Sequence, residues 1–293
     1  MRFSLWPALL ACLLGGQLAG SAAWAQEGVA AGMVAVPAAA PDLSVATGGL
    51  AQAILEGADV TRVQALIRQG ADVNTPDAQG RVPLIAAIAR DDVEIAALLL
   101  DKGARIGATG PDGMPALSAA AMVGHPEMVQ LLLDRGASAN AQPASGMTPL
   151  AIACMAARPE VMAHFSATLS DRTEVANILL NHGADPDVRS PDGLTLLMHM
   201  AVDGPAQIAA LLLERGVQAN ATGPKDVTAL MLAAQNGNVE VLKLLLRHGA
   251  NRAMKDSKGR TALDLARAAG QQAAAELLQG KAHRRPHGSI RHK

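Results

Sequence analysis

The feature that most constrains this chain is a glycine that returns every 33 residues after a leucine-rich run. The spacing is 33 at each step except one of 47, and the glycines are Gly70, Gly103, Gly136, Gly183, Gly216 and Gly249. A second glycine follows ten residues later, at Gly80, Gly113, Gly146, Gly193 and Gly259, and only Asp226 breaks that series. A fixed period of this length is typical of arrays that stack one supersecondary unit many times.

The third repeat illustrates the expected unit. Apolar residues recur there at the helical spacings of three and four on two short segments, which are Leu117, Ala120 and Ala121, then Met128, Leu131 and Leu132. Gly124 separates the two segments, and Gly136 follows the second, where a left-handed residue closes a helix. Because neither helix can bury its apolar stripe alone, we expect the repeats to stack into an all-α solenoid.

The composition narrows the classes of function. Hydrophobic residues make up 50% of the chain, which is enough for a core and excludes a disordered protein. The 25 lysine and arginine residues nearly balance 26 acidic ones, so the chain lacks the basic footprint of a duplex-binding protein. The chain has no tyrosine, and both tryptophans lie in the first 25 residues, so the repeats offer no aromatic platform for unpaired bases. We therefore expect no nucleic-acid partner.

The repeats resemble those of ankyrin-repeat proteins. The sixth is the clearest and reads DVTALMLAAQNGNVEVLKLLLRHGAN over 226–251, while others repeat parts of it: GHPEMVQLLLDRGAS, GMTPLAIA and GRTALDLA. The resemblance covers residues 49–280 as about seven helix-turn-helix repeats joined by short hairpin-like loops. No repeat has the histidine that usually follows Thr-Pro-Leu in this family, and the fifth places His199 and Met200 where a leucine and an alanine are usual. Local distortion is expected there.

The resemblance implies binding of another protein through the hairpin tips and the concave faces of the first helices. Carried over position by position, the exposed concave residues are Arg81, Arg90, Met114, Met122, Val123, Met147, Met155, Leu194, Val202, Val227, Gln235 and Asn236. The sharpest hypothesis is a methionine-lined groove in repeats three to five, because unbranched methionine adapts to irregular apolar partners. The alternative is that these methionines fold back and fill the core.

The N-terminus reads as a secretory signal over 1–25, with an Ala-Trp-Ala site cleaved after Ala25. A lipoprotein signal ending before Cys12 is the alternative, although it would leave a very short apolar region. Residues 26–48 are rich in Ala, Gly and Pro and are expected to form a flexible linker. The signal predicts export, to the periplasm of a bacterium or into the medium, and after cleavage the chain would not be an integral membrane protein.

Cleavage leaves Cys154 as the single cysteine, so no intramolecular disulfide is expected. Burial is the ordinary fate of such a residue, and a reactive thiol paired with His199 is the alternative.

Two segments lie outside the regular repeats. The step of 47 places a 14-residue insertion between the two helices of repeat four, near 158–172, either as a projecting finger or as packed helix. The last segment, 281–293, has five basic residues, three histidines and no acid. It is expected to be a disordered tail; contact with anionic lipid or an acidic partner and weak metal capture by the histidines are the alternatives.

Taken together, the sequence predicts an exported, monomeric, non-catalytic scaffold that binds a protein partner and needs no cofactor or metal. Phosphate-binding, zinc-protease, hydrolase and dinucleotide motifs are absent from the sequence. The alternative is an accessory factor for a periplasmic redox, peroxide-defence or metal enzyme, because the resemblance includes exported bacterial ankyrin proteins linked to peroxide defence.

Overall fold

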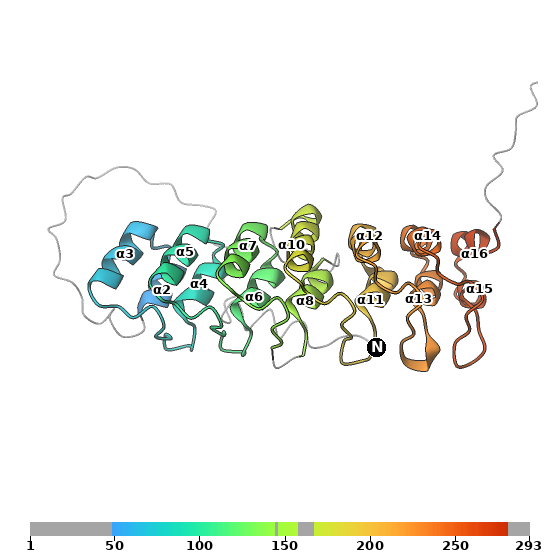
Figure 1. The fold of residues 1–293 in the computed structure, drawn as a ribbon, viewed down its shortest axis with the longest axis horizontal. Coiled ribbons are helices and arrows are strands. Elements are labelled where there is room, and N and C mark those ends of the chain that lie inside the picture. Colours follow the sequence, from blue (N-terminus) through green and yellow to red (C-terminus); the bar gives the residue numbers. More distant parts are fainter. Residues whose placement is uncertain (1–48, 144–145, 158–166, 281–293) are drawn as a thin grey trace, which may run out of the picture. The chain divides into compact units, whose positions relative to one another are not determined.

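The computed structural model describes residues 49–143, 146–157 and 167–280, and their regular elements are short helices joined by loops (Figure 1). The all-α solenoid is confirmed in these residues. They fall into two compact units, which are described separately: an N-terminal unit up to Ser145 and a C-terminal unit from Gly146. The predicted signal, linker and tail lie outside the described residues, as does the part of the insertion at 158–166.

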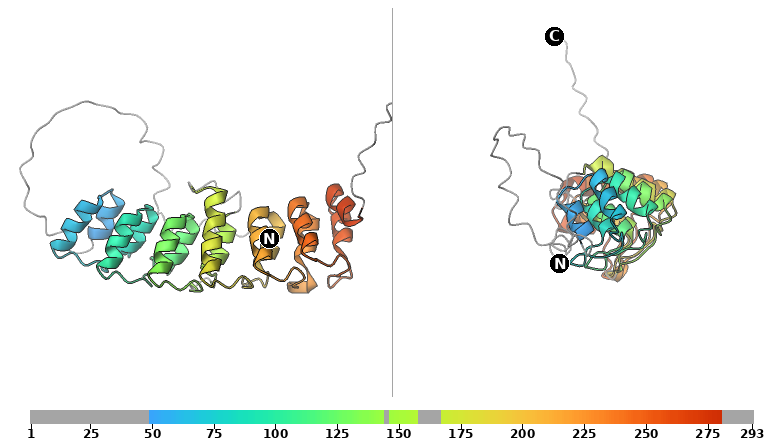
Figure 2. Two further views of the ribbon diagram at one scale, coloured as in Figure 1. Left: turned by 45° about the horizontal axis from the view of Figure 1, so that its top comes forward. Right: turned by 90° about the vertical axis from the view of Figure 1, so that its left-hand side faces the viewer.

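The N-terminal unit holds repeats one to three, each made of two antiparallel helices. The first helices, α2 (Gly49–Leu55), α4 (Pro83–Ala89) and α6 (Ala116–Val123), pack on one another in one row. The second helices, α3 (Val60–Arg68), α5 (Val93–Asp101) and α7 (Pro126–Asp134), form a second row behind it. Figure 2 shows these blue to green pairs stacked in register within the unit.

The C-terminal unit holds repeats four to seven in the same arrangement. The first helices are α8 (Pro149–Ala156), α11 (Leu196–Asp203), α13 (Ala229–Asn236) and α15 (Ala262–Ala268). The second helices are α10 (Leu169–Asn181), α12 (Ala206–Glu214), α14 (Val239–Arg247) and α16 (Gln272–Leu278). A short 3-10 turn, η2 (Pro224–Asp226), lies in the loop before α13.

Threonine side chains start the first helices of the C-terminal unit. The hydroxyl oxygens of Thr148, Thr195, Thr228 and Thr261 each accept from the backbone N–H three residues later. This bond satisfies one of the donors that a helix start leaves open and is typically worth about 1 kcal/mol. Caps of this kind fix where each repeat begins, so the hairpin loops that precede them keep one register.

The loop glycines that mark the repeat adopt left-handed backbone, with φ of +77° at Gly80 and +81° at Gly193. Asp226, which breaks the series in the sequence, has φ of +59°. The loop of repeat six therefore keeps the turn, and an aspartate takes a conformation that glycine adopts at lower cost.

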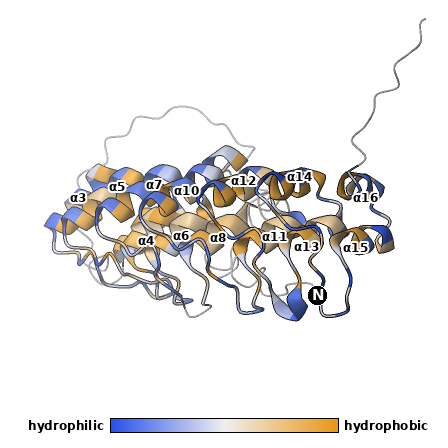
Figure 3. Cartoon of the chain, turned by 45° about the vertical axis from the view of Figure 1, so that its right-hand side comes forward, coloured by the Kyte–Doolittle hydropathy of each residue, from blue (hydrophilic) through white to orange (hydrophobic). Residues whose placement is uncertain are grey.

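The core is aliphatic, as the composition predicts, and Figure 3 shows apolar residues dominating α4 and α6. Five of the six apolar positions predicted to face inward in repeat three are buried; the exception, Leu131, is half-buried. Repeat five is regular, because α11 spans eight residues like α6, so the distortion expected around His199 is not seen. No helix in the described part of the chain is long and apolar enough to cross a bilayer.

The described part of the insertion lengthens a helix. α10 has 13 residues, whereas α5, α7, α12 and α14 each have nine. Its start is fixed by a capping box, in which Thr168 and Asp171 bond each other's backbone N–H groups. The fully buried Arg172 lies in the added turn, and burial lowers the pKa of its guanidinium to about 10.

Candidate partner-binding site

Three of the methionines predicted to line an exposed groove are buried. Met114, Met122 and Met155 are only 4%, 3% and 7% exposed. The prediction of exposure is therefore wrong for these three residues. For Met122 and Met155 the physical reason lies in α6 and α8, whose sequences ALSAAAMV and PLAIACMA are rich in small alanine side chains. A long, unbranched thioether adapts to irregular gaps in a core.

The other predicted concave residues keep some exposure. Arg90, Gln235 and Asn236 are exposed, and the half-buried residues are Arg81, Val123, Met147, Leu194, Val202 and Val227. Repeat three belongs to the N-terminal unit, and repeats four and five belong to the C-terminal unit. A groove continuous over repeats three to five therefore stays a prediction.

The N-terminal unit contains a pocket of about 120 Å³ between its first helices and its hairpin loops. Two of the predicted residues, Arg81 and Met114, line it. Most of the remaining lining is apolar, and it includes Leu55, Ile85, Ala89 and Pro111. For comparison, a cavity of about 150 Å³ holds one benzene molecule. The pocket thus has room for one side chain of a partner.

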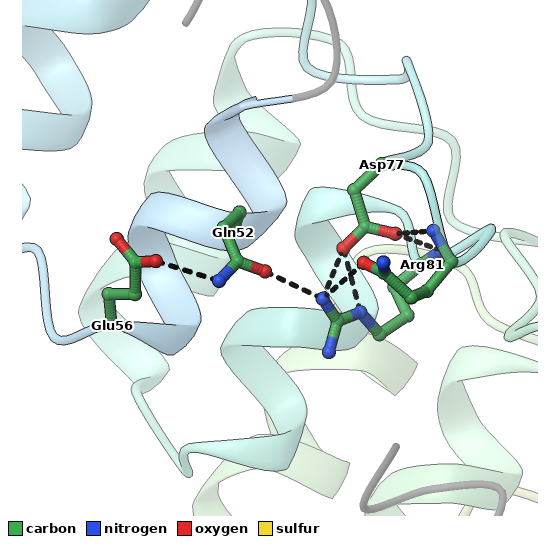
Figure 4. Close-up of polar contacts among 5 residues, drawn as sticks. Gln52, Glu56, Asp77 and Arg81 are labelled. Atoms are coloured by element: carbon green, nitrogen blue, oxygen red, sulfur yellow. Dashed lines mark hydrogen bonds and ion pairs between the residues drawn. The ribbon is translucent and has the colours of Figure 1, made fainter. Parts of the chain in front are cut away.

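Arg81 is held at the edge of this pocket by a chain of hydrogen bonds (Figure 4). Its Nε donates to Asp77 Oδ2 at 2.7 Å, and its Nη2 donates to Gln52 Oε1 at 2.7 Å. The amide of Gln52 in turn donates to Glu56 Oε1 at 2.7 Å. These hydrogen bonds link the hairpin loop of repeat two to α2, so the guanidinium of Arg81 has a fixed position. The carboxylate of Asp77 balances its charge.

Asp77 is suited to this role because it is buried and fully hydrogen-bonded. Burial alone would raise its pKa, but hydrogen bonds from the Arg81 side chain and from the backbone N–H groups of Arg81 and Gln79 outweigh it. The pKa of the Asp77 carboxyl is therefore held below its ordinary value. Repeat seven has the same arrangement, with Arg260 Nε donating to Asp256 Oδ2 at 2.8 Å.

Asp112 contributes a carboxylate to the lining, and sequence reasoning did not select it. Its Oδ1 accepts from the backbone N–H of Met114 at 3.0 Å. A Cβ at Gly110 would lie 2.9 Å from that oxygen, so a larger residue there would require the Asp112 side chain to shift. The other oxygen, Oδ2, is buried and has no hydrogen-bond partner among the residues that the structure describes. In the sequence, the feature that points to Asp112 is the Pro-Asp-Gly triplet, which occurs at 111–113 and again at 191–193.

The C-terminal unit brings together a serine, a histidine and an aspartate, which raises the question of catalysis. Ser190 Oγ lies 2.8 Å from His199 Nε2 and 3.0 Å from the carbonyl oxygen of Leu194, and it also bonds Asp192 Oδ1. The hydroxyl has one proton, and the carbonyl and carboxylate oxygens can only accept it. Nε2 must then donate to Oγ, so His199 cannot take a proton from Ser190. The cluster ties the hairpin loop of repeat five to α11.

Cys154 is also placed for packing. It is fully buried in α8, and burial raises the pKa of its thiol to about 12. The nucleophilic thiolate is therefore absent at neutral pH. His182 caps the C-terminal end of α10, and its Nδ1 lies 2.9 Å from the carbonyl oxygen of Ile178. In the described part of the chain, no group of three His, Cys, Asp or Glu side chains is placed to hold a metal ion.

Comparisons with known proteins agree with this architecture. Models of ankyrin repeats match residues 79–110, 103–165, 163–251 and 198–285. The ankyrin repeat domain of human ASB11 is 27% identical, with a TM-score of 0.63, over 80% of this chain and 97% of that one. The ankyrin repeat domain of Bcl-3, a member of the IkappaB protein family, has the same fold at 24% identity, with a TM-score of 0.66 over 79% of this chain and 97% of that one.

No curated protein matches the chain. The family models together span well over half of it, from residue 79 to residue 285, and they cover repeats two to seven. The chain therefore belongs to the ankyrin-repeat family.

Proposed function

We propose that the chain is an exported, non-catalytic scaffold that binds a protein partner through the pocket of repeats one to three. Proteins of this family generally act as protein-binding modules, which supports the class of function. The observation that carries the proposal is the pocket itself, because it combines a largely apolar lining with Arg81 and Asp112 at one site. Sites of this kind, apolar with a few placed polar groups, are typical of specific recognition.

The proposed surface differs from the methionine-lined groove that the sequence suggests. Met122 and Met155 are core residues, whereas Arg81 and Met114 border the pocket. Binding is expected to centre on repeats one to three, with the exposed Arg90 beside the pocket. A redox, peroxide-defence or metal enzyme would be one class of protein partner for such a scaffold. Identification of the bound partner tests this alternative.

The test uses a pocket-filling variant, Ala89→Phe, with a matched control. Ala89 is half-buried at the end of α4 and lines the pocket, so a phenyl ring there is expected to block it. Ala268 ends α15 in the same repeat position and is exposed, so Ala268→Phe adds an equal ring away from the pocket. The three proteins are immobilised and exposed to extract of the source cells, and retained proteins are identified by mass spectrometry.

A protein retained by wild type and Ala268→Phe but lost by Ala89→Phe supports the proposal. Equal retention by Ala89→Phe, or no specific retention by any of the three, contradicts it. Export is tested independently by fractionating the source cells and sequencing the N-terminus of the mature protein, which is expected to begin at Gln26. A chain that remains in the cytoplasm with residues 1–25 attached would refute the export part.

A further inference from the structure

The hairpin loops of repeats six and seven, residues 217–228 and 250–261, differ from the earlier loops in charge. One loop position precedes the glycine that marks the repeat, or Asp226 in repeat six. It holds an aspartate in repeats three and five, at Asp112 and Asp192. In repeats six and seven it holds Lys225 and Lys258, and both lysines are exposed. The last two loops therefore present positive charge where two earlier loops carry negative charge.

Loops six and seven are also held together. The backbone N–H of Ser257 donates to the carbonyl oxygen of Lys225 at 2.9 Å, and Lys258 follows Ser257 directly. Figure 1 shows the two loops on the same edge of α13 and α15. Lys225 has left-handed backbone, with φ of +60°, which is uncommon for a long side chain. The contact with Ser257 thus fixes the tip of loop six beside the tip of loop seven.

The acids of these loops leave most of this positive charge available. Loops six and seven together have five basic and two acidic residues. One of the acids, Asp256, is buried and paired with Arg260, whose Nη2 lies 2.7 Å from its Oδ2. Among the residues that the structure describes, three exposed lysines of the two loops have no ion pair: Lys225, Lys255 and Lys258. Three unpaired cations thus lie on two adjoining loops.

The loop of repeat five, residues 184–195, has the opposite charge. It has three acidic residues and one basic residue, and the side chain of Asp192 is 40% exposed. Loop five contacts loop six, because Arg189 Nη1 donates to the carbonyl oxygen of Thr222 at 2.9 Å. A lipid surface or a nucleic-acid backbone is negative throughout, so loop five would repel what loop seven attracts. A protein segment can match both signs, so the charges favour a protein partner.

The spacing of the loops suits an extended segment. Packed helices lie about 8–10 Å apart, and each repeat contributes one loop, so the loop tips follow one another at about that distance. A polyproline-type extended chain has three residues per turn and rises about 3.1 Å per residue. Every third side chain therefore returns to the same face after about 9 Å. One residue in three can then face one loop each.

We propose that the hairpin loops of repeats five to seven bind an extended acidic segment of a protein partner. Its carboxylates lie on Lys225 and Lys258, and a basic residue three positions away lies on Asp192. This inference goes beyond the proposed function, because it places a second recognition surface in the C-terminal unit. The surface does not depend on the pocket of repeats one to three.

The first experiment titrates the full chain, labelled with 15N, with two synthetic peptides and follows the backbone amide signals by NMR. The peptides carry glutamate, glutamate and lysine at every third position, in this order and in the reverse order, with serine and alanine between. At least one order is expected to shift the signals of Lys225 and Lys258 in a saturable way. Binding should weaken at high salt, because the contact is ionic and exposed. No saturable shift with either order overturns the proposal.

The second experiment reverses single charges. Lys225→Asp and Lys258→Asp each install the residue type that repeats three and five carry there, and each is expected to weaken peptide binding about fivefold or more, through lost attraction and new repulsion. Lys243→Glu is the matched control, because it reverses the same charge on α14, in the second row of helices, and should leave binding unchanged. Equal affinity of wild type and the loop variants would place the peptide elsewhere on the chain, such as at 281–293, and overturn the proposal.

The place of the basic residue has its own test. Asp192→Asn is expected to weaken binding of the peptide that contains lysine, but not of a peptide in which serine replaces that lysine. An equal effect on the two peptides overturns the contact with Asp192.

The outcomes separate this inference from the proposed function and from a membrane surface. Ala89→Phe is expected to bind the peptide with wild-type affinity, so loss of the peptide in that variant would contradict a separate surface. Vesicles that contain anionic phosphatidylglycerol are tested by co-sedimentation. If vesicles bind and are lost with Lys258→Asp while neither peptide binds, the loops recognise lipid and the proposal is wrong.

Discussion

Replacing Met122 with glutamate is expected to destabilise the protein strongly. The side chain is 3% exposed, so the substitution removes an apolar group whose full burial is worth about 1.5–3 kcal/mol. It also places a carboxylate in the core, which costs several kcal/mol more unless the group takes up a proton. The total of roughly 4–7 kcal/mol is a large share of the ordinary folding free energy of about 5–15 kcal/mol. An exposed Met122 would predict almost no change.

The assay is urea unfolding followed by far-UV circular dichroism, at neutral pH and again near pH 5. Burial favours the neutral form of the introduced glutamate, so its deficit should shrink as the pH falls and the group is protonated. Two controls isolate the cause. Met122→Leu conserves volume and should cost less than about 1.5 kcal/mol. Gln235→Glu introduces the same charge at the equivalent, exposed position of α13 and should change stability by less than about 0.5 kcal/mol.

A Met122→Glu protein that unfolds at the same urea concentration as wild type would refute the burial of this residue. With that result, the methionines would again be candidates for the partner-binding surface. The result also decides how capture experiments are interpreted, because a variant that unfolds loses every partner for a reason unrelated to recognition. Ala89→Phe avoids this difficulty, since Ala89 is half-buried at the open side of a pocket.

Two further predictions concern single groups. The first uses a Cys12→Ala background, so that Cys154 is the single thiol. Cys154 should not react with a thiol reagent at pH 8 while the protein is folded, because burial raises the pKa of its thiol to about 12. It should react fully in denaturant, and rapid reaction of the folded protein would contradict its burial. The side-chain hydrogen bond from Arg260 is the largest cause that holds the pKa of Asp256 below its ordinary value of 3.8. The folded state therefore binds fewer protons, so this stabilisation is complete above that value and is lost as the pH falls through the folded-state pKa. The difference in urea midpoint between wild type and Asp256→Asn should thus narrow from pH 7 to pH 3, and a constant difference would show that the ion pair is not its source.

The sequence was sufficient to predict the repeats because their period and apolar spacing follow from helix geometry and from the need to stack. It also predicted that Cys154 would be buried, which is its position in α8. The exposure of the methionines could not be predicted in the same way. The resemblance assigns Met122 to an exposed position of α6 from its place in the repeat, but a flexible, unbranched thioether can pack into the protein where its neighbours are small alanines, and Met122 is buried.

The fifth repeat shows a second limit of sequence reasoning. A histidine in place of a buried leucine predicts distortion, because a polar ring in a core needs a partner. The partner is Ser190, nine residues earlier, which the hairpin loop brings within 2.8 Å of His199. Ser190 occupies the loop position that Asp77 and Asp256 hold in repeats two and seven. Two unusual residues therefore compensate each other, and neither is informative alone.

The same packing rule explains why the candidate site lies in repeats one to three. Where a first helix carries methionine at the repeat position of Met122, as α8 does with Met155, the long side chain is itself buried. Where it carries alanine, as α4 does with Ala89, that space stays open, and the hairpin loops then border it with Arg81 and Asp112. Small side chains open the pocket and the loop residues give it polarity, so Ala89→Phe should alter recognition more than Met122→Leu, which conserves volume at the equivalent position of α6.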